Sequence, residues 1–307
     1  MSLFRTKSIE QSIADAAEPG HQLKRSLSAW DLMILGVAVA VGAGIFSVGA
    51  RAAGSFAGPA VTVSFLLAAL ACALAIMCYA EFASTIPVAG SAYTYTYATL
   101  GELLAWIVGW DLLLELLTAA AVIAKYWGIY LSTVFALLDV HIPTTLHLFG
   151  LAVEWGPLFI VGVFTSLLVL GTKVSARVNN VFTMIKVGIV LFVIVVGFTY
   201  FDAANLVPFV PPAVPSAGSS ADVWSQSLLS WATGDAPAKY GIAGVLSGAA
   251  LVFFAFIGFD VVATSAEEVK DPQKTLPRGI FGGLALVTIL YLLVALALTG
   301  MVPYTVL

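Results

Sequence analysis

The chain has 307 residues, of which 61% are hydrophobic and only 10% are charged, and its formal net charge is −4. Soluble domains carry about 25% charged residues, and the mean hydropathy here is +1.03, so the composition excludes an ordinary soluble protein. We therefore predict an integral membrane protein whose main partner is a lipid bilayer. Its acidic balance leaves no basic surface for nucleic acid.

Apolar stretches of about 20 residues, the length of helix that crosses a bilayer, predict an all-α protein with seven transmembrane helices. The third stretch can continue as a long tilted helix through "YWGIYLSTVFALL", and the fourth is short. The predicted spans are residues 30–53, 58–84, 100–125, 156–171, 179–200, 241–267 and 279–302.

The lysines and arginines predict the orientation of these spans. They gather before the first span, between the fourth and fifth, and between the sixth and seventh, and the cytoplasmic loops of membrane proteins are enriched in these residues. We expect a multi-pass protein of the plasma membrane with a cytoplasmic N-terminus. The predicted divisions are a cytoplasmic segment at 1–29, five helices at 30–200, an extracellular loop at 201–240 that is rich in Pro, Ser and Gly, and two helices at 241–307.

Two of the spans carry glycine near their middle. The first contains Gly42 and Gly44, which either break the helix or let another helix pack closely. The sixth contains Gly258, with Asp260 two residues later. Irregular backbone at membrane depth survives only where protein or a water-filled cavity covers it, and breaks five spans apart are typical of inverted-repeat transporters.

A pair of broken helices predicts a site for an α-amino acid. Free N–H groups at Ala43, Gly44 and Ile45 suit a carboxylate, and unpaired carbonyls on the two helices suit an ammonium group. No set of catalytic residues and no cluster of metal ligands is evident, so we expect no enzyme, no metal and no cofactor. The candidate substrate-binding residues are Val39, Ala40, Gly42, Ala43, Gly44, Ile45, Phe254, Ala255, Phe256 and Gly258.

Four segments carry a family resemblance: "GVAVAVGAGIF", "YAEFASTIPVAGSAYTYTYATLGELLAWIVGWDLLLE", "SARVNNVFTMIKV" and "FFAFIGFDVVATSAEEVKDPQKTLPRGI". They closely resemble the amino acid/polyamine/organocation superfamily, and most specifically its bacterial branch similar to cationic amino acid transporters. The resemblance implies a leucine-transporter-type fold, substrate held between spans one and six, and coupling to protons. It also implies ten to twelve spans, so that the chain is expected to be C-terminally truncated, with the first repeat and two helices of the second.

Ionisable residues inside the spans are functional candidates by default. The resemblance makes Lys186 in span five the expected proton-coupling residue, and Phe254 the residue that closes over the substrate. Asp260 is expected to be a pocket or gate carboxylate, with a helix-end partner as the alternative. Glu115 is expected either to balance Lys186 or to meet a cationic substrate. For Glu267 and Glu268, a solvated turn is favoured over a gate latch.

The sequence therefore predicts a proton-coupled amino acid permease that imports its substrate by alternating access. The alternatives are an amino acid exchanger or a non-transporting sensor of the same fold, and, more remotely, a seven-helix receptor. The choice between cationic and small neutral substrates stays open at this point, as do the oligomeric state and the presence of a small accessory subunit.

Overall fold

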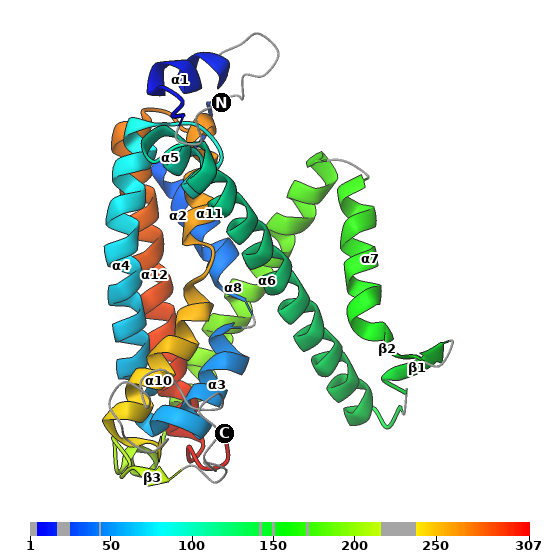
Figure 1. Ribbon diagram of the computed structural model, residues 1–307. Coiled ribbons are helices and arrows are strands. Elements are labelled where there is room, and N and C mark those ends of the chain that lie inside the picture. Colours follow the sequence, from blue (N-terminus) through cyan, green and yellow to red (C-terminus); the bar gives the residue numbers. More distant parts are fainter. Residues whose placement is uncertain are drawn as a thin grey trace.

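The computed structural model describes residues 5–16, 25–42, 44–140, 143–148, 151–169, 172–215 and 238–307. Its elements are mostly helices (Figure 1). In the first part of the chain they are α1 (Ile9–Ala16), α2 (Ala29–Ala40), a π-helical turn (Gly44–Val48), α3 (Gly49–Ala52), a second π-helical turn (Ala53–Ala57), a 3-10 turn (Gly58–Ala60), α4 (Val61–Thr85), α5 (Ser91–Thr99) and α6 (Glu102–Leu137).

The second part contains longer helices and two short hairpins. It comprises β1 (Thr145–Leu148), β2 (Leu151–Glu154), α7 (Trp155–Val169), α8 (Thr172–Thr199), a 3-10 turn (Ala203–Leu206), β3 (Val214–Pro215), β4 (Ala238–Lys239), α10 (Gly241–Phe253), a 3-10 turn (Phe254–Phe256), α11 (Phe259–Thr264), a 3-10 turn (Ser265–Glu268) and α12 (Pro272–Met301).

The all-helical prediction missed the two short hairpins. Strands β1 and β2 pair antiparallel, with Thr145 opposite Glu154, and β3 pairs antiparallel with β4. The second hairpin pairs residues 214–215 with 238–239, both within the predicted extracellular loop. Residues 216–237 of that loop lie outside the described residues.

Among the described residues, five helical stretches are long and apolar enough to cross a membrane: Gly44–Thr85, Glu102–Leu137, Val181–Thr199, Gly241–Glu268 and Pro272–Met301. Two shorter apolar helices, α2 and α7, fall below that length. The prediction of an all-α membrane protein is confirmed in its main part, but the count of seven spans is not. The first predicted span is split at its glycines, and α7 has only 15 residues.

Helix α12 packs against α2, α4 and α8 in a bundle that α10 joins by packing against α4 (Figure 1). Its Tyr291 ring packs edge-on against Phe65 of α4 and against Phe256, with ring centroids 5.5 and 5.0 Å apart. Small residues bring the backbones close, as is common where membrane helices pack. Gly248 of α10 lies against Ser64 of α4, whose hydroxyl donates to the Val245 carbonyl at 2.8 Å.

Helix α6 runs obliquely away from this bundle, and α7 packs beside its far end (Figure 1). Of the 36 residues of α6 only Ala105 and Ala124 are buried. Large side chains such as Trp106, Trp110 and Leu114 are exposed along it. Such a surface suits contact with lipid or with further apolar helices.

Helix α2 begins with a capping box. The Ser28 hydroxyl accepts from the Asp31 N–H, and the Asp31 carboxylate accepts from the Ser28 N–H at 2.8 Å. Both bonds satisfy N–H groups that the first turn of a helix cannot pair.

We expect Ser28→Ala to lower the free energy of unfolding by about 1 kcal/mol, the usual cost of losing an N-cap. The measurement is thermal or denaturant unfolding in detergent. Ser26→Ala is the matched control, because Ser26 contributes its backbone N–H to a bond with the Glu268 carbonyl. Equal destabilisation by both substitutions would contradict the role of the cap.

Candidate substrate and coupling site

The first break lies between α2 and the π-helical turn that starts at Gly44. Helix α2 ends at Ala40, and Val41 has extended backbone angles of φ −72° and ψ 99°. Gly42 is exposed in the irregular segment, and Ala43 lies outside the described residues. The N–H groups of Gly44 and Ile45 begin a new turn, in which the first N–H groups have no partner within the helix.

The second break separates α10 from α11. The 3-10 turn Phe254–Phe256 ends at Ile257, which is extended with ψ 134°, and Gly258 has φ +114°. A Cβ atom on Gly258 would stand 2.4 Å from Cγ1 of Val39, on the other broken helix. Glycine is therefore favoured at position 258 for two reasons: the positive φ, and the lack of room for a Cβ beside Val39.

The two breaks touch each other. A Cβ atom added to Gly44 would lie 2.8 Å from both Cα and Cβ of Ala255. Both interpretations of the first glycine pair therefore apply, because the helix is interrupted and Gly44 also permits close packing. The interrupted segments of the first and sixth predicted spans, far apart in the sequence, are therefore in direct contact at Gly44 and Ala255.

A residue that the sequence analysis missed joins the two breaks. The hydroxyl of Tyr291 on α12 lies 2.6 Å from the Ala40 carbonyl oxygen and 2.6 Å from the Ala255 carbonyl oxygen. One hydroxyl proton serves one of these carbonyls at a time, and each carbonyl keeps a second lone pair. The available signal was a tyrosine in the middle of an apolar span, because a buried tyrosine hydroxyl requires a polar partner.

Three of the carbonyl groups at the breaks have hydrogen-bond donors within the protein. The Phe254 carbonyl accepts from the Ile257 N–H at 3.2 Å, because this residue closes the 3-10 turn. The Ala40 and Ala255 carbonyls face Tyr291. The ring of Phe256 is buried against Tyr291, whereas Phe254 is half-buried.

Lys186 reaches the first break from α8. Its half-buried side chain donates a hydrogen bond from Nζ to the Ala38 carbonyl, in the last turn of α2. This carbonyl belongs to the end of a helix where the dipole favours a cation. The structure thus places Lys186 beside the broken first helix, two residues from the carbonyl that Tyr291 contacts.

The two predicted carboxylates lie on α6 and α11. Glu115 is half-buried on α6, a helix that packs chiefly on α5 and α7. Asp260 lies in the first turn of α11, and its side chain is outside the described part of the structure. Their assignments as coupling or gate residues stay predictions.

A cavity of about 10 Å³ lies beside the two breaks, with room for about one water molecule. Its wall is apolar and comes from both broken helices and α12. The lining residues are Gly36, Ala40, Phe256, Val262, Ile280, Gly283, Leu284 and Val287.

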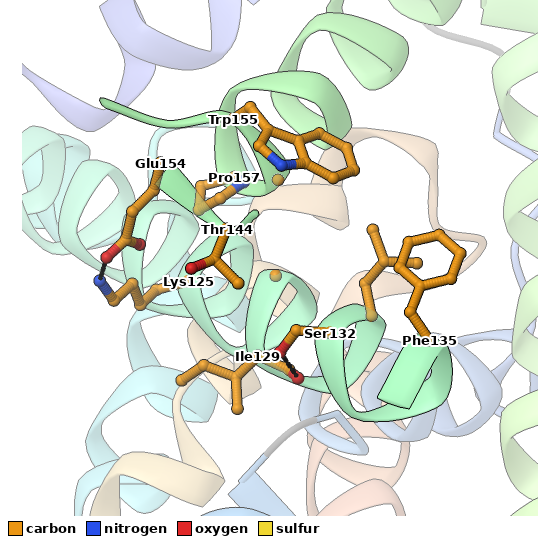
Figure 2. Close-up of a pocket in the computed structure, with 11 residues that line it drawn as sticks. Lys125, Ile129, Ser132, Phe135, Thr144, Glu154, Trp155 and Pro157 are labelled. Carbon is orange, nitrogen blue, oxygen red and sulfur yellow. Dashed lines mark hydrogen bonds and ion pairs between the residues drawn. The ribbon is translucent and has the colours of Figure 1, made fainter. Parts of the chain in front are cut away.

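A larger cavity of about 230 Å³ lies between α6 and α7, beside the first hairpin (Figure 2). At its rim Lys125 forms an ion pair with Glu154, and the Trp155 indole donates to the Pro143 carbonyl at 2.8 Å. None of its lining residues belongs to a broken helix. Within the described ranges, no group of three or more His, Cys, Asp or Glu side chains could hold a metal ion.

Comparison with known proteins gives a match over nearly the whole chain. Residues 27–307 match a family described as amino acid permease. The chain is 43% identical to the branched-chain amino acid permease BcaP of Bacillus subtilis and 41% identical to its methylthioribose transporter, in each case over 99% of this chain and 60% of the relative. It is 37% identical to the vacuolar cationic amino acid transporter 4 of Arabidopsis thaliana, over 99% of this chain and 48% of that protein. The chain thus spans about half of the length of these relatives.

Proposed function

Because the chain belongs to the amino acid permease family, we propose that it carries amino acids across a membrane by alternating access and that protons drive their import. Permeases move their substrates without chemical change, so the protein is a transporter and not an enzyme. The proposal includes a plasma-membrane location, a cytoplasmic N-terminus and seven crossings in the arrangement of a leucine-transporter-type repeat.

One observation carries this proposal most strongly. Two interrupted helices touch at Gly44 and Ala255, and the hydroxyl of Tyr291 lies between their carbonyls at Ala40 and Ala255. Half-helix ends of this kind bind substrates and ions in transporters with broken helices. A substrate ammonium group has the same need for carbonyl acceptors as the hydroxyl, and the second lone pair of each carbonyl is available to it.

The substrate carboxylate requires hydrogen-bond donors. We propose that the N–H groups of Gly44 and Ile45 supply them, because these two residues start a helical turn whose dipole favours an anion. The N–H group of Ala43 is part of the proposal from its place in the sequence. Phe254 is proposed to close the site over the substrate. We propose that the breaks bind the ammonium and carboxylate groups common to all amino acids. The residues at the breaks are small and permit either a cationic or a neutral substrate side chain.

Lys186 is the proposed proton carrier. In its charged form the ammonium group is attracted to the carbonyl end of α2 through Ala38. Loss of the proton removes that attraction and leaves α2 free to move relative to α8. The protonation state of one side chain would thus bias the position of the broken first helix, which is what coupling requires.

The test is uptake of radiolabelled alanine, leucine and arginine into proteoliposomes that hold the full-length protein, with and without an inward proton gradient. We expect the gradient to drive uptake, and Lys186→Ala to reduce that uptake to the level seen without a gradient. Lys125→Ala is the matched control, because Lys125 pairs with Glu154 away from the breaks. Methylthioribose, the substrate that one relative's name states, is the comparison solute.

Other outcomes separate the alternatives. Uptake that ignores the gradient and Lys186 but requires amino acid on the far side would overturn proton coupling and indicate an exchanger. Binding without any flux would indicate a sensor. Uptake of methylthioribose in preference to every amino acid would contradict the proposed substrate class.

A further inference from the structure

Two loops meet at the end of the bundle where α2 begins. One is the turn 265–270 between α11 and α12, and the other is the segment 86–90 between α4 and α5. The carboxylate of Glu267 accepts a hydrogen bond from the Ala89 N–H at 2.8 Å. The sequence favoured a solvated turn here, but Glu267 is half-buried and bonded to a residue 178 positions away.

The same turn is bonded to the residues that lead into α2. Leu27 and Val269 form a parallel bridge. The Leu27 N–H donates to the Glu268 carbonyl at 2.9 Å, and the Lys270 N–H donates to the Leu27 carbonyl at 3.2 Å. The turn after α11 therefore makes two kinds of contact. Its backbone is bonded to the residues that lead into α2, and its Glu267 side chain is bonded to the segment before α5.

The backbone is strained at Ser91, the first residue of α5, which directly follows the segment held by Glu267. Ser91 has φ +50°, a value that non-glycine residues rarely adopt. The hydroxyls of Ser91 and Tyr95 are buried, with residue exposures of 2% and 5%, and neither has a hydrogen-bond partner within the described part of the chain. Unpaired buried hydroxyls disfavour this arrangement relative to one in which water reaches them.

We propose that Glu267 is the latch of the cytoplasmic gate, and that its release exposes the hydroxyls of Ser91 and Tyr95 to water. The inference rests on the proposed alternating access. Helix α11 is the second half of the broken sixth span, and Glu267 follows it by three residues. A swing of α11 that opens the breaks toward the cytoplasm must break the bond to Ala89. The strain and the unpaired hydroxyls favour opening, and the charge-assisted bond opposes it.

The test measures the gate directly. A Ser91→Cys reporter is placed in a Cys78→Ser background of the full-length protein, because Cys78 is exposed and Cys72 is buried. A membrane-impermeant thiol reagent is then applied from each side of the membrane in turn. We expect Glu267→Ala to increase labelling from the cytoplasmic side about ten-fold, the change produced by losing one charge-assisted hydrogen bond. Glu267→Gln keeps a neutral acceptor and should give a smaller increase.

Glu268→Ala is the matched control, since Glu268 uses its backbone carbonyl in the bonds described above. If Glu267→Ala and Glu268→Ala label alike, the latch is wrong, whatever the transport results show. A latch also predicts opposite changes in KM on the two sides, with the external KM raised and the internal KM lowered as the population shifts. Equal rises on both sides would indicate simple structural damage and overturn the inference. If labelling increases but the wild-type protein transports no substrate, the latch stands and the proposed function fails.

Discussion

Gly258→Ala is expected to abolish transport and to lower the stability of the folded protein by more than about 3 kcal/mol, because a steric clash adds to backbone strain of about 1–3 kcal/mol. The new Cβ would stand 2.4 Å from Cγ1 of Val39, and the residue would have to keep φ at +114°. Val39 is β-branched and 36% exposed, so relief of the clash requires its side chain to rotate or the two interrupted segments to separate. The measurements are the yield of folded protein, thermal unfolding in detergent, and amino acid uptake.

Two further variants make the Gly258 result interpretable. Gly188→Ala on α8 is the control, because no heavy atom lies within 4 Å of the Cβ it would carry, and we expect it to be neutral or slightly stabilising. Val39→Ala in the Gly258→Ala background should restore part of the stability by removing the clash, and should leave the cost of the backbone angle. A Gly258→Ala protein as stable and active as Gly188→Ala would contradict the geometry of the second break.

The interruption of spans one and six was predictable from the sequence, because glycine in a membrane helix is a local signal. The pairing of the two breaks followed from their spacing and from the family resemblance. The exact contact between Gly44 and Ala255 did not, since it depends on how two helices rotate against each other. The family match over residues 27–307 confirms the resemblance.

Tyr291 and Glu267 show why part of the site escaped prediction. A hydropathy window counts tyrosine as one apolar residue among many, and it gives no information about which carbonyls its hydroxyl will meet. The partners of Tyr291 lie 36 and 251 positions away, and the partner of Glu267 lies 178 positions away. Such bonds are properties of the packed bundle, because no local pattern encodes a backbone acceptor on another helix.

Tyr291→Phe is expected to lower the free energy of unfolding by about 1–3 kcal/mol in the empty protein, the cost of leaving a buried polar group without its partner. The phenylalanine ring keeps the packing against Phe65 and Phe256, so the loss is confined to the hydroxyl. The carbonyls of Ala40 and Ala255 then lack a donor. Thermal unfolding of the purified protein without substrate measures this effect.

The same substitution tests whether a substrate ammonium group uses those carbonyls. If it does, bound amino acid supplies the missing donor, so saturating substrate should stabilise Tyr291→Phe more than it stabilises the wild-type protein. Tyr304→Phe, beyond the end of α12, is the control and should leave the stabilisation by substrate unchanged. An equal stabilisation in Tyr291→Phe and wild type would place the ammonium group elsewhere. The two carbonyls would then serve only to join the broken helices through Tyr291, and the substrate would have to be held by other groups at the breaks.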